Sequence, residues 1–108
     1  MLKIHVSNNL PLLISHLLKR KPECPLEFNN RKVYDLSKIS LKDTLFPVSQ
    51  IVLYPETKRH PREQRVFANT LLGISYECHI DILTYSPYIL SELDRPDDTY
   101  CHHISYGD

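Results

Sequence analysis

The first twenty residues show two regular spacings of apolar side chains. Residues 2–6, Leu-Lys-Ile-His-Val, alternate apolar and polar positions, and this period of two predicts a short strand with one buried face. Apolar side chains then recur at the spacing of an amphipathic helix, at Leu10, Leu13, Ile14, Leu17 and Leu18. Asn8 or Asn9 would cap the start of this helix, and Pro22 would end it after a basic last turn at residues 19–21.

The stretch between residues 23 and 50 has a weaker pattern. Asn29-Asn30 favours a tight turn between residues 26–28 and 31–36, which predicts a hairpin. Ser40 and Asp43 have the spacing of a helix cap, and they predict a short helix that ends before Pro47. No repeat or linker interrupts the chain. We therefore expect residues 1–108 to form a single domain, with 1–50 less clearly defined than 51–108.

The second half begins with an apolar strand at residues 51–53, followed by a helix. Pro61 suits the first turn of that helix because its missing N–H costs nothing there. Gly73 is expected to cap the end of the helix. The apolar face is predicted at Val66, Phe67, Thr70, Leu71 and Ile74.

The remaining elements continue the same alternation. Residues 79–84 predict a strand, Ser86 and Pro87 start a short helix that reaches Leu93, and residues 100–106 predict a last strand. Strands that alternate with helices are typical of parallel sheets. The sequence therefore predicts an α/β fold, with a small, partly parallel sheet and crossover helices.

Composition narrows the classes of partner. Thirteen basic residues balance thirteen acidic ones, so the whole chain has no net field that would attract nucleic acid or an anionic membrane. No apolar run approaches the roughly 20 residues of a membrane helix. The three cysteines form neither an even set nor a C-x-x-C pair, which favours a reducing compartment. We expect a cytoplasmic protein without a membrane partner.

Two segments of the second half resemble motifs of a known family. They are residues 51–73, IVLYPETKRHPREQRVFANTLLG, and residues 80–93, IDILTYSPYILSEL. The chain resembles the ABC-like ATPase heads of the bacterial AAA/OLD/SMC-type group. In those heads an apolar strand ends in acidic-Glu-Pro-Glu, followed by Leu-His-Pro and a helix, and the next strand ends in Thr-His-Ser-Pro-Tyr. The resemblance implies the C-terminal half of such a head.

The chain departs from this family at the positions of its chemistry. The resemblance puts Leu53 at the Walker B carboxylate that holds Mg²⁺, and Tyr54 at the glutamate that orients the attacking water. It puts Tyr85 at the switch histidine, beside a matching Ser86. Neither Leu53 nor Tyr54 offers the hard oxygen ligand or the base that these steps need. The matching residues are mostly turn and cap positions: Pro55, Glu56, His60, Pro61, Gln64, Ser86, Pro87 and Tyr88.

A phosphate-binding loop of the form G-x-x-x-x-G-K-[ST] is excluded, because the chain has only two glycines, Gly73 and Gly107. We therefore expect no ATPase activity and no ATP or Mg²⁺ cofactor, and we expect Glu56 to form a contact within its turn. The sequence favours a non-catalytic remnant or split-off piece of an ATPase, whose partner would be a full-length or complementary ATPase subunit. A sheet without its N-terminal strands would expose an apolar edge.

Two other hypotheses about function depend on different residues. Lys58, Arg59, Arg62 and Arg65 form a basic cluster, so the alternative function is a small nucleic-acid-binding module; 58, 62 and 65 would share one helix face if the helix starts early. The cysteine and histidine pairs suggest zinc, at Cys78, His79, Cys101, His102 and His103. Neighbours on a strand point to opposite faces, so too few ligands converge and we expect no metal site.

Overall fold

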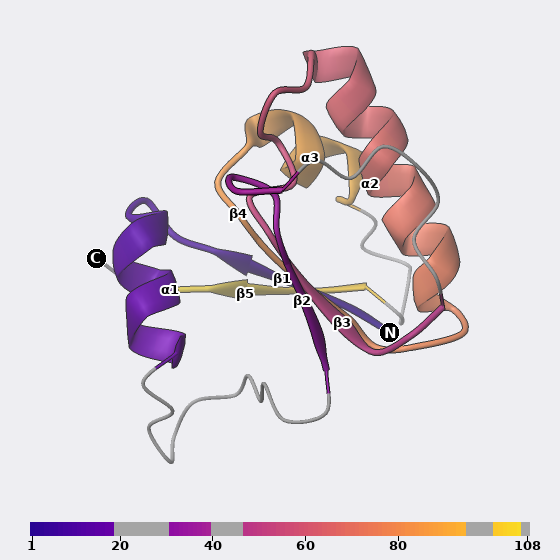
Figure 1. Ribbon diagram of the computed structural model, residues 1–108. Helices are drawn as coiled ribbons and strands as arrows, with labels where there is room; N and C mark the ends of the chain where they lie inside the picture. The colour runs from indigo at the N-terminus through magenta and orange to yellow at the C-terminus, as the bar shows by residue number, and fades with distance from the viewer. Residues whose placement is uncertain (19–30, 40–46, 95–100, 107–108) are drawn as a thin grey trace.

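The computed structural model describes residues 1–18, 31–39, 47–94 and 101–106. Within these residues five parallel strands form one sheet with three helices, which confirms the predicted α/β class (Figure 1). Every strand pairing is parallel, where the sequence predicted a partly parallel sheet. The elements are β1 (Leu2–Val6), α1 (Leu10–Leu18), β2 (Lys32–Asp35), β3 (Gln50–Leu53), α2 (Pro61–Ser75), β4 (Ile80–Thr84), α3 (Pro87–Glu92) and β5 (Cys101–Ser105).

The N-terminal strand lies inside the sheet. The strand order is β2-β3-β4-β1-β5, so β1 pairs with β4 on one side and with β5 on the other. Ile4 is in register with Ile82 of β4 and with His103 of β5. The predicted strand at residues 2–6 is therefore confirmed, and it lies inside the sheet.

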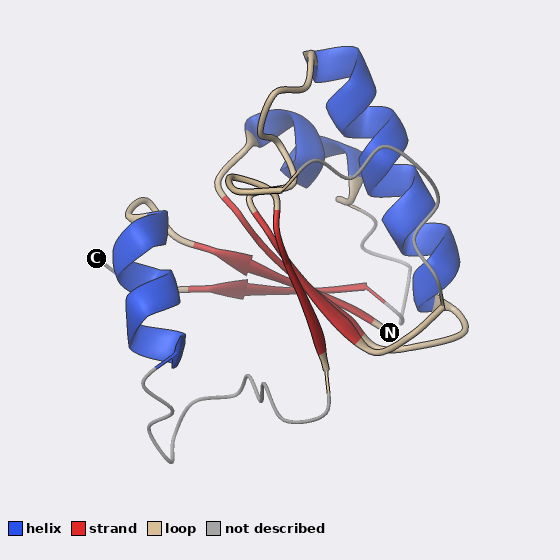
Figure 2. Ribbon diagram, in the orientation of Figure 1, coloured by secondary structure: helices blue, strands red, loops and turns tan. Residues whose placement is uncertain are grey.

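The helices cover opposite faces of the sheet (Figure 1, Figure 2). On one face, α1 packs its Leu10 and Leu13 against apolar side chains of β3 and β4, namely Ile51, Leu53 and Leu83. On the other face, α2 and α3 pack against the alternate residues of the same strands, including Val52, Ile80 and Ile82. Right-handed crossovers explain this arrangement, since α1 leaves β1 towards β2 whereas α2 leads in the opposite direction along the sheet.

Helix starts follow the predicted chemistry. Asn9 caps α1, because its Oδ1 accepts from the Leu12 N–H at 3.2 Å. Pro61 occupies the first position of α2, and Ser86 caps α3 by accepting from the Ile89 N–H. These three starts confirm the sequence-based predictions.

The buried face and the end of α2 differ from the prediction. Val66 and Thr70 are exposed, and the buried residues of the helix are Gln64, Ala68, Leu71, Leu72 and Ser75. The predicted C-terminal cap at Gly73 is also wrong. Gly73 lies within the helix without a positive φ, and Tyr76 is the C-cap residue in a right-handed conformation. The helix thus continues through Gly73, because buried residues on both sides of it, Leu72 and Ser75, pack against the rest of the protein.

Replacing Gly73 with alanine is expected to stabilise the protein by about 0.5–1 kcal/mol, because alanine loses less backbone freedom in a helix interior. A Cβ at this position would meet no atom within 4 Å. Urea unfolding followed by circular dichroism measures the change. A decrease in the free energy of unfolding would contradict the helical, unobstructed environment of Gly73.

Several sequence predictions fall on residues outside the described part. These are the basic helix end at residues 19–22, the first arm of the hairpin at 26–28 with its turn, and most of the short helix before Pro47. The second arm of the hairpin is described as β2, which pairs in parallel with β3.

Candidate functional site

The carboxyl ends of β1 and β4 define the candidate site. The two strands are neighbours, yet the chain leaves β1 towards α1 on one face and leaves β4 towards α3 on the other. Such a switch point opens a crevice between the two loops, and in open α/β sheets this crevice is where ligands bind. The connections at this edge include residues 7–9 after β1, 54–60 after β3 and 85–86 after β4.

Leu53 and Tyr54 lie at the end of β3, at the positions for which the sequence analysis considered catalytic carboxylates. Leu53 is 4% exposed and belongs to the apolar cluster under α1. Tyr54 adopts a φ of 57°, an uncommon conformation for a residue with a side chain, and its N–H donates to the Leu83 carbonyl at 3.2 Å. Burial, with the charges of Asp35 and Glu56, raises the pKa of the Tyr54 phenol. The tip of β3 therefore offers apolar packing and a protonated phenol.

A hydrogen-bonded network joins the β3 turn to the end of β4. The Thr84 hydroxyl donates to Glu56 Oε2 at 2.9 Å and accepts from the Ser86 N–H at 3.1 Å. The Ser86 hydroxyl donates to the Gln64 side-chain carbonyl, and the Gln64 amide donates to the Arg59 carbonyl at 3.0 Å. Glu56, Ser86 and Gln64 thus fix the turn onto the sheet.

The connection between β1 and α1 lies where a phosphate-binding loop would join its strand to its helix. It contains only three residues, Ser7, Asn8 and Asn9. The Ser7 hydroxyl accepts from the Asn9 N–H at 3.1 Å, and the Asn9 side chain accepts from the Leu12 N–H of the first helical turn. A glycine-rich loop would direct such N–H groups towards a phosphate, whereas here side chains of the same loop accept them.

A buried polar chain crosses the α1 face of the sheet. Arg31 Nη1 lies 2.6 Å from one oxygen of Asp81, and His5 Nε2 lies 2.8 Å from the other. His5 Nδ1 lies 2.9 Å from the Tyr106 hydroxyl, and the two rings stack. Burial alone raises the pKa of Asp81, but the hydrogen bond from His5 and the charge of Arg31 outweigh it and lower the pKa below its ordinary value.

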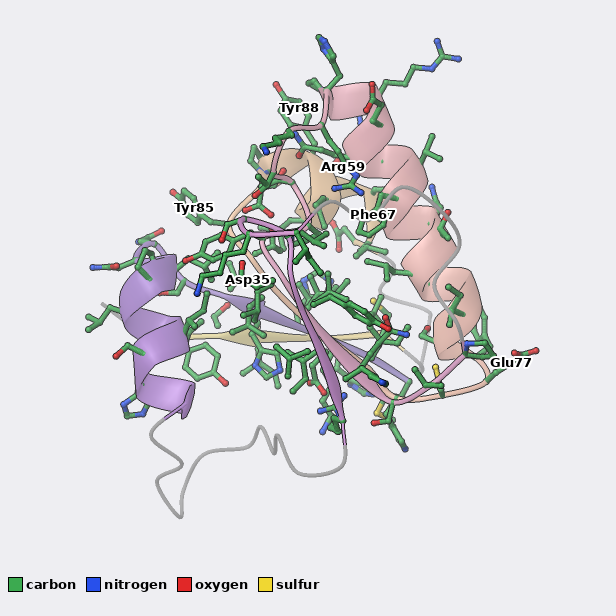
Figure 3. All side chains as sticks on the ribbon, in the orientation of Figure 1. Asp35, Arg59, Phe67, Glu77, Tyr85 and Tyr88 are labelled. Carbon is green, nitrogen blue, oxygen red and sulfur yellow. The ribbon has the colours of Figure 1, made fainter. Side chains whose placement is uncertain are left out.

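The basic cluster is only partly directed to solvent. Lys58 lies in the turn at a φ of 58°, before α2 begins at Pro61, so it does not share a helix face with Arg62 and Arg65. The Arg59 guanidinium lies 4.1 Å above the Phe67 ring and donates to the Pro55 carbonyl. Figure 3 labels Arg59 and Phe67. Arg65 lies 5.5 Å from the centre of the Tyr88 ring. Lys58, Arg62 and Arg65 are exposed, whereas Arg59 is half-buried.

The cysteine and histidine pairs take part in separate contacts. Cys101 is buried on β5 beside the Leu93 carbonyl, and His103 Nε2 lies 3.1 Å from that carbonyl. Cys78 follows α2 and approaches the Ile74 carbonyl. Among the residues that the structure describes, no group of three His, Cys, Asp or Glu side chains could hold a metal ion.

Sequence reasoning missed the chain of Arg31, Asp81, His5 and Tyr106. The signal in the sequence was an acidic residue, Asp81, between the apolar residues Ile80 and Ile82 of a predicted strand. A fully buried strand tolerates a charge only when a partner neutralises it. His5 and Asp81 are separated by 76 positions in sequence, so only the strand pairing brings them together.

Comparison of the chain with protein families, with curated proteins and with solved structures found no match. In the part of the chain that the structure describes, no helix is long and apolar enough to cross a membrane.

Proposed function

We propose that the protein is a non-catalytic relative of the ABC-like ATPase head, and that it acts by binding a complementary ATPase subunit. The observation that carries the proposal is the network at the carboxyl edge of the sheet. The polar side chains there, Glu56, Thr84, Ser86 and Gln64, bond to one another, while Leu53 packs in the core. These polar side chains are thus engaged with one another, and Leu53 and Tyr54 offer neither a carboxylate that would bind Mg²⁺ nor a base that would activate water.

The strand order supports the likeness to an ATPase head. A Walker B residue and a switch residue act on the same phosphate, so they must lie at neighbouring strand ends. β3 and β4 are neighbours, with Leu53 in register with Leu83. β1 and its helix lie on the other side of β4, where a phosphate-binding loop would complete the site. This strand order is the one expected if the chain is related to an ATPase head in which the catalytic residues at positions 53, 54 and 85 have been replaced.

Exposed aromatic residues give this edge the character of an interaction surface. Tyr85 is 53% exposed and Tyr88 is 39% exposed. Tyr85 directly follows β4 and Tyr88 lies in the first turn of α3, and Figure 3 labels both. Arg65 lies over the Tyr88 ring. Tyrosine and arginine are enriched among the residues that contribute most to protein–protein binding. Tyr85 and Tyr88 would thus be the main contacts with the partner subunit.

The alternative, a nucleic-acid-binding module, stays a prediction. It depends on the exposed Lys58, Arg62 and Arg65, since Arg59 is half-buried and stacks on Phe67. Each phosphate contact contributes separately to salt-dependent binding, so three exposed cations support only weak affinity. The aromatic surface favours a protein partner.

Two measurements test the proposal. The purified chain with ATP and Mg²⁺ is expected to show no hydrolysis above buffer, and Glu56→Gln is expected to leave this background unchanged because glutamine can still accept from Thr84.

Cross-linking in the native host is expected to capture a P-loop ATPase subunit, and the double variant Tyr85→Ser, Tyr88→Ser is expected to lose this capture. Hydrolysis that Glu56→Gln abolishes would disprove the proposal, as would capture that is unchanged in the double variant.

A further inference from the structure

Arg65 and Tyr88 join α2 and α3, which lie side by side on one face of the sheet (Figure 1). The Arg65 guanidinium lies over the Tyr88 ring, 5.5 Å from its centre, and both residues are exposed. One helical turn further along α2, the Asn69 amide donates to the Glu92 carboxylate of α3. The two helices thus share an outer surface on which an aromatic ring adjoins a cation.

Two more basic side chains extend this surface towards the start of α2. Arg62 precedes Arg65 by three positions, so the two side chains leave the helix on the same side. Lys58 lies in the turn that leads into α2. Lys58 and Arg62 are exposed, as Arg65 is. We refer to Lys58, Arg62, Arg65 and Tyr88 as the basic Tyr88 surface.

Basic side chains outnumber acidic ones in this part of the chain, although the whole chain is neutral. Residues 56–65 contain four basic and two acidic residues. Within the described residues, every ion pair involves Asp35 or Asp81, and neither of them pairs with a cation of the basic Tyr88 surface. The exposed cations of this surface are therefore available to carboxylates of another molecule.

The acidic side chains close to this surface have other partners. Glu56 accepts a hydrogen bond from the last residue of β4 at 2.9 Å, and Glu92 accepts one from α2. Burial lowers the pKa of the Arg59 guanidinium, and the charge of Glu63 opposes this effect, so Arg59 is within reach of the Glu63 charge. Each of these carboxylates thus has a partner outside the basic Tyr88 surface.

This combination of residues fits an acidic protein segment better than a nucleic acid strand. A base would need the face of the Tyr88 ring for stacking, and Arg65 already lies over that ring. A carboxylate can pair with the N–H groups at the edge of a guanidinium while the plane of the guanidinium stays on an aromatic ring. Opposite charges across an interface also speed association and disfavour partners of the wrong sign.

We propose that the basic Tyr88 surface binds an acidic segment of the partner subunit, in which carboxylates flank one apolar side chain. The carboxylates pair with Arg62 and Arg65, and the apolar side chain packs on the exposed part of the Tyr88 ring. This binding mode rests on the proposed function only for the identity of the partner, because binding of an acidic segment can be measured without the partner.

Titration of the full chain with a short peptide, followed by NMR, tests the acidic segment. The probe is acetyl-Glu-Glu-Phe-Glu-Glu-amide, and its control is acetyl-Gln-Gln-Phe-Gln-Gln-amide, which has the same length and ring without the charges. The acidic peptide is expected to bind with a Kd on the order of 1 mM at low salt and to shift the ring signals of Tyr88. The glutamine peptide is expected to bind at least about tenfold more weakly, and added salt is expected to weaken the acidic peptide.

A thymidine pentanucleotide is the nucleic-acid control, because it carries as many phosphates as the peptide has carboxylates. It is expected to bind more weakly than the acidic peptide. Tighter binding of the pentanucleotide would assign the surface to nucleic acid and overturn the proposal. Equal binding of the two peptides, or no saturation up to about 20 mM acidic peptide, would overturn it as well.

The two tests distinguish failure of the acidic segment from failure of the proposed function. If the acidic peptide does not bind and the cross-linking still captures an ATPase subunit, the acidic segment alone is rejected. If the acidic peptide binds and no ATPase subunit is captured, the proposed function is rejected and recognition of an acidic segment stands.

A matched pair of charge reversals locates the binding. Arg62→Glu and Lys32→Glu change the net charge of the chain by the same amount, and Lys32 is exposed at the first residue of β2, away from α2. Arg62→Glu is expected to weaken the acidic peptide by about tenfold or more, and Lys32→Glu by less than about twofold because solvent ions screen distant charges. A glutamate in the first turn suits the dipole of α2, and circular dichroism verifies that both variants fold. Equal effects would reject the surface.

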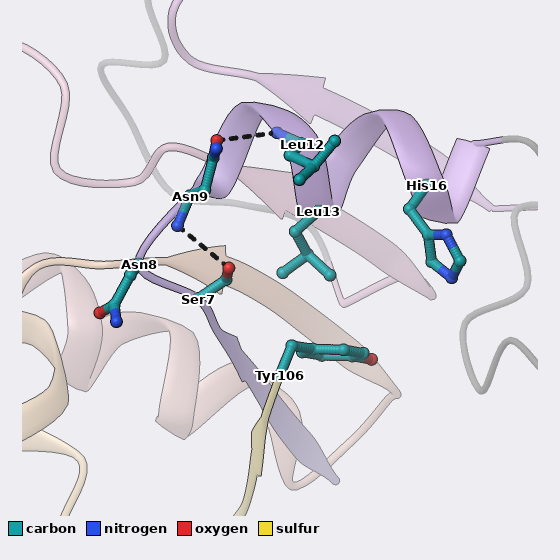
Figure 4. Close-up of a pocket in the computed structure, with 7 residues that line it drawn as sticks. All are labelled: Ser7, Asn8, Asn9, Leu12, Leu13, His16 and Tyr106. Atoms are coloured by element: carbon teal, nitrogen blue, oxygen red, sulfur yellow. Dashed lines mark hydrogen bonds between the residues drawn. The ribbon is translucent and has the colours of Figure 1, made fainter. Parts of the chain in front are cut away.

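A second pair tests the aromatic contact. Leu12 is 64% exposed on α1, on the opposite face of the sheet, where it lines a pocket between α1 and Tyr106 (Figure 4). Tyr88→Ala is expected to weaken the acidic peptide by about threefold to tenfold, because the phenylalanine of the peptide loses an apolar contact. Leu12→Ala is expected to leave the Kd unchanged. A Kd that Tyr88→Ala also leaves unchanged would overturn the contact with the ring.

Discussion

Replacing Asp81 with asparagine is expected to lower the free energy of unfolding by about 3 kcal/mol at pH 7. Removal of one partner from a buried ion pair costs this much because the remaining charge stays out of water without its counter-ion. Asp81 is 6% exposed and accepts from both Arg31 and His5. Asparagine is neutral and has only one acceptor oxygen, so it cannot bond equally well to both donors. Urea unfolding followed by circular dichroism measures the loss.

The effect of Asp81 depends on pH in a direction that its pKa determines. Its pKa in the folded protein is lowered from the ordinary value of 3.8. The stabilisation is therefore fully present above pH 3.8, and it is lost as the pH falls through the lower folded pKa. The difference in stability between the natural chain and Asp81→Asn should be constant from about pH 7 to 5 and shrink below about pH 4.

An exposed ion pair of the same chain provides the control. Lys38 lies 3.9 Å from Asp35, and the lysine side chain is 81% exposed. Lys38→Gln is expected to change the free energy of unfolding by less than about 0.5 kcal/mol, because solvent screens such pairs. If Asp81→Asn had an effect as small as that of Lys38→Gln, the buried chain of Arg31, Asp81 and His5 would not contribute to stability.

Restoring the carboxylate of the resembled Walker B motif, by Leu53→Asp, is expected to destabilise the fold by about 4 kcal/mol or more without creating ATPase activity. The substitution removes a buried leucine and puts an acidic group among Leu10, Leu13 and Leu83. Its register partner on β2 is Asp35, so a second acidic residue would lie opposite. An apolar core side chain thus lies at the position where the resembled ATPase heads would have a metal-binding carboxylate.

Two further substitutions separate the charge of Leu53→Asp from the change of volume. Leu53→Met keeps an apolar side chain of similar size and is expected to cost less than about 1.5 kcal/mol. Leu53→Ala removes apolar volume without adding a charge, and it should cost about 2–4 kcal/mol. Thermal and urea unfolding rank the three variants, and a Mg²⁺-dependent ATPase assay accompanies them. A Leu53→Asp protein as stable as Leu53→Met would contradict the placement of Leu53 in the core.

Local pattern predicted the elements of the second half well, because the signals there act within a few residues. Pro61 and Ser86 act at helix starts through the first turn alone, and the apolar strands at 51–53 and 80–84 are recognisable by composition. The face of α2 was predicted less well. Val66 lies on the exposed side while Gln64 is buried, since Gln64 bonds to Ser86 of the neighbouring loop. A polar residue that tertiary contacts satisfy cannot be distinguished from an exposed one by periodicity.

In the candidate site too, contacts between residues close in sequence could be predicted, whereas contacts between different strands could not. Leu53, Tyr54 and Glu56 could be placed together from the sequence because they are consecutive or nearly so. The hydrogen bond between Glu56 and Thr84, and the chain from Arg31 to Tyr106, join residues from different strands. Their formation depends on which strands are neighbours, and no local spacing contains that information.

The sequence by itself determined the α/β class and most of the described element boundaries. These properties follow from side-chain identity and from short-range periodicity. The tertiary structure alone decided that β1 lies between β4 and β5, that His5 meets Asp81, and that α1 forms a pocket with Tyr106. Strand order is set by packing and pairing over the whole chain, and this order brings together the residues that carry both proposals.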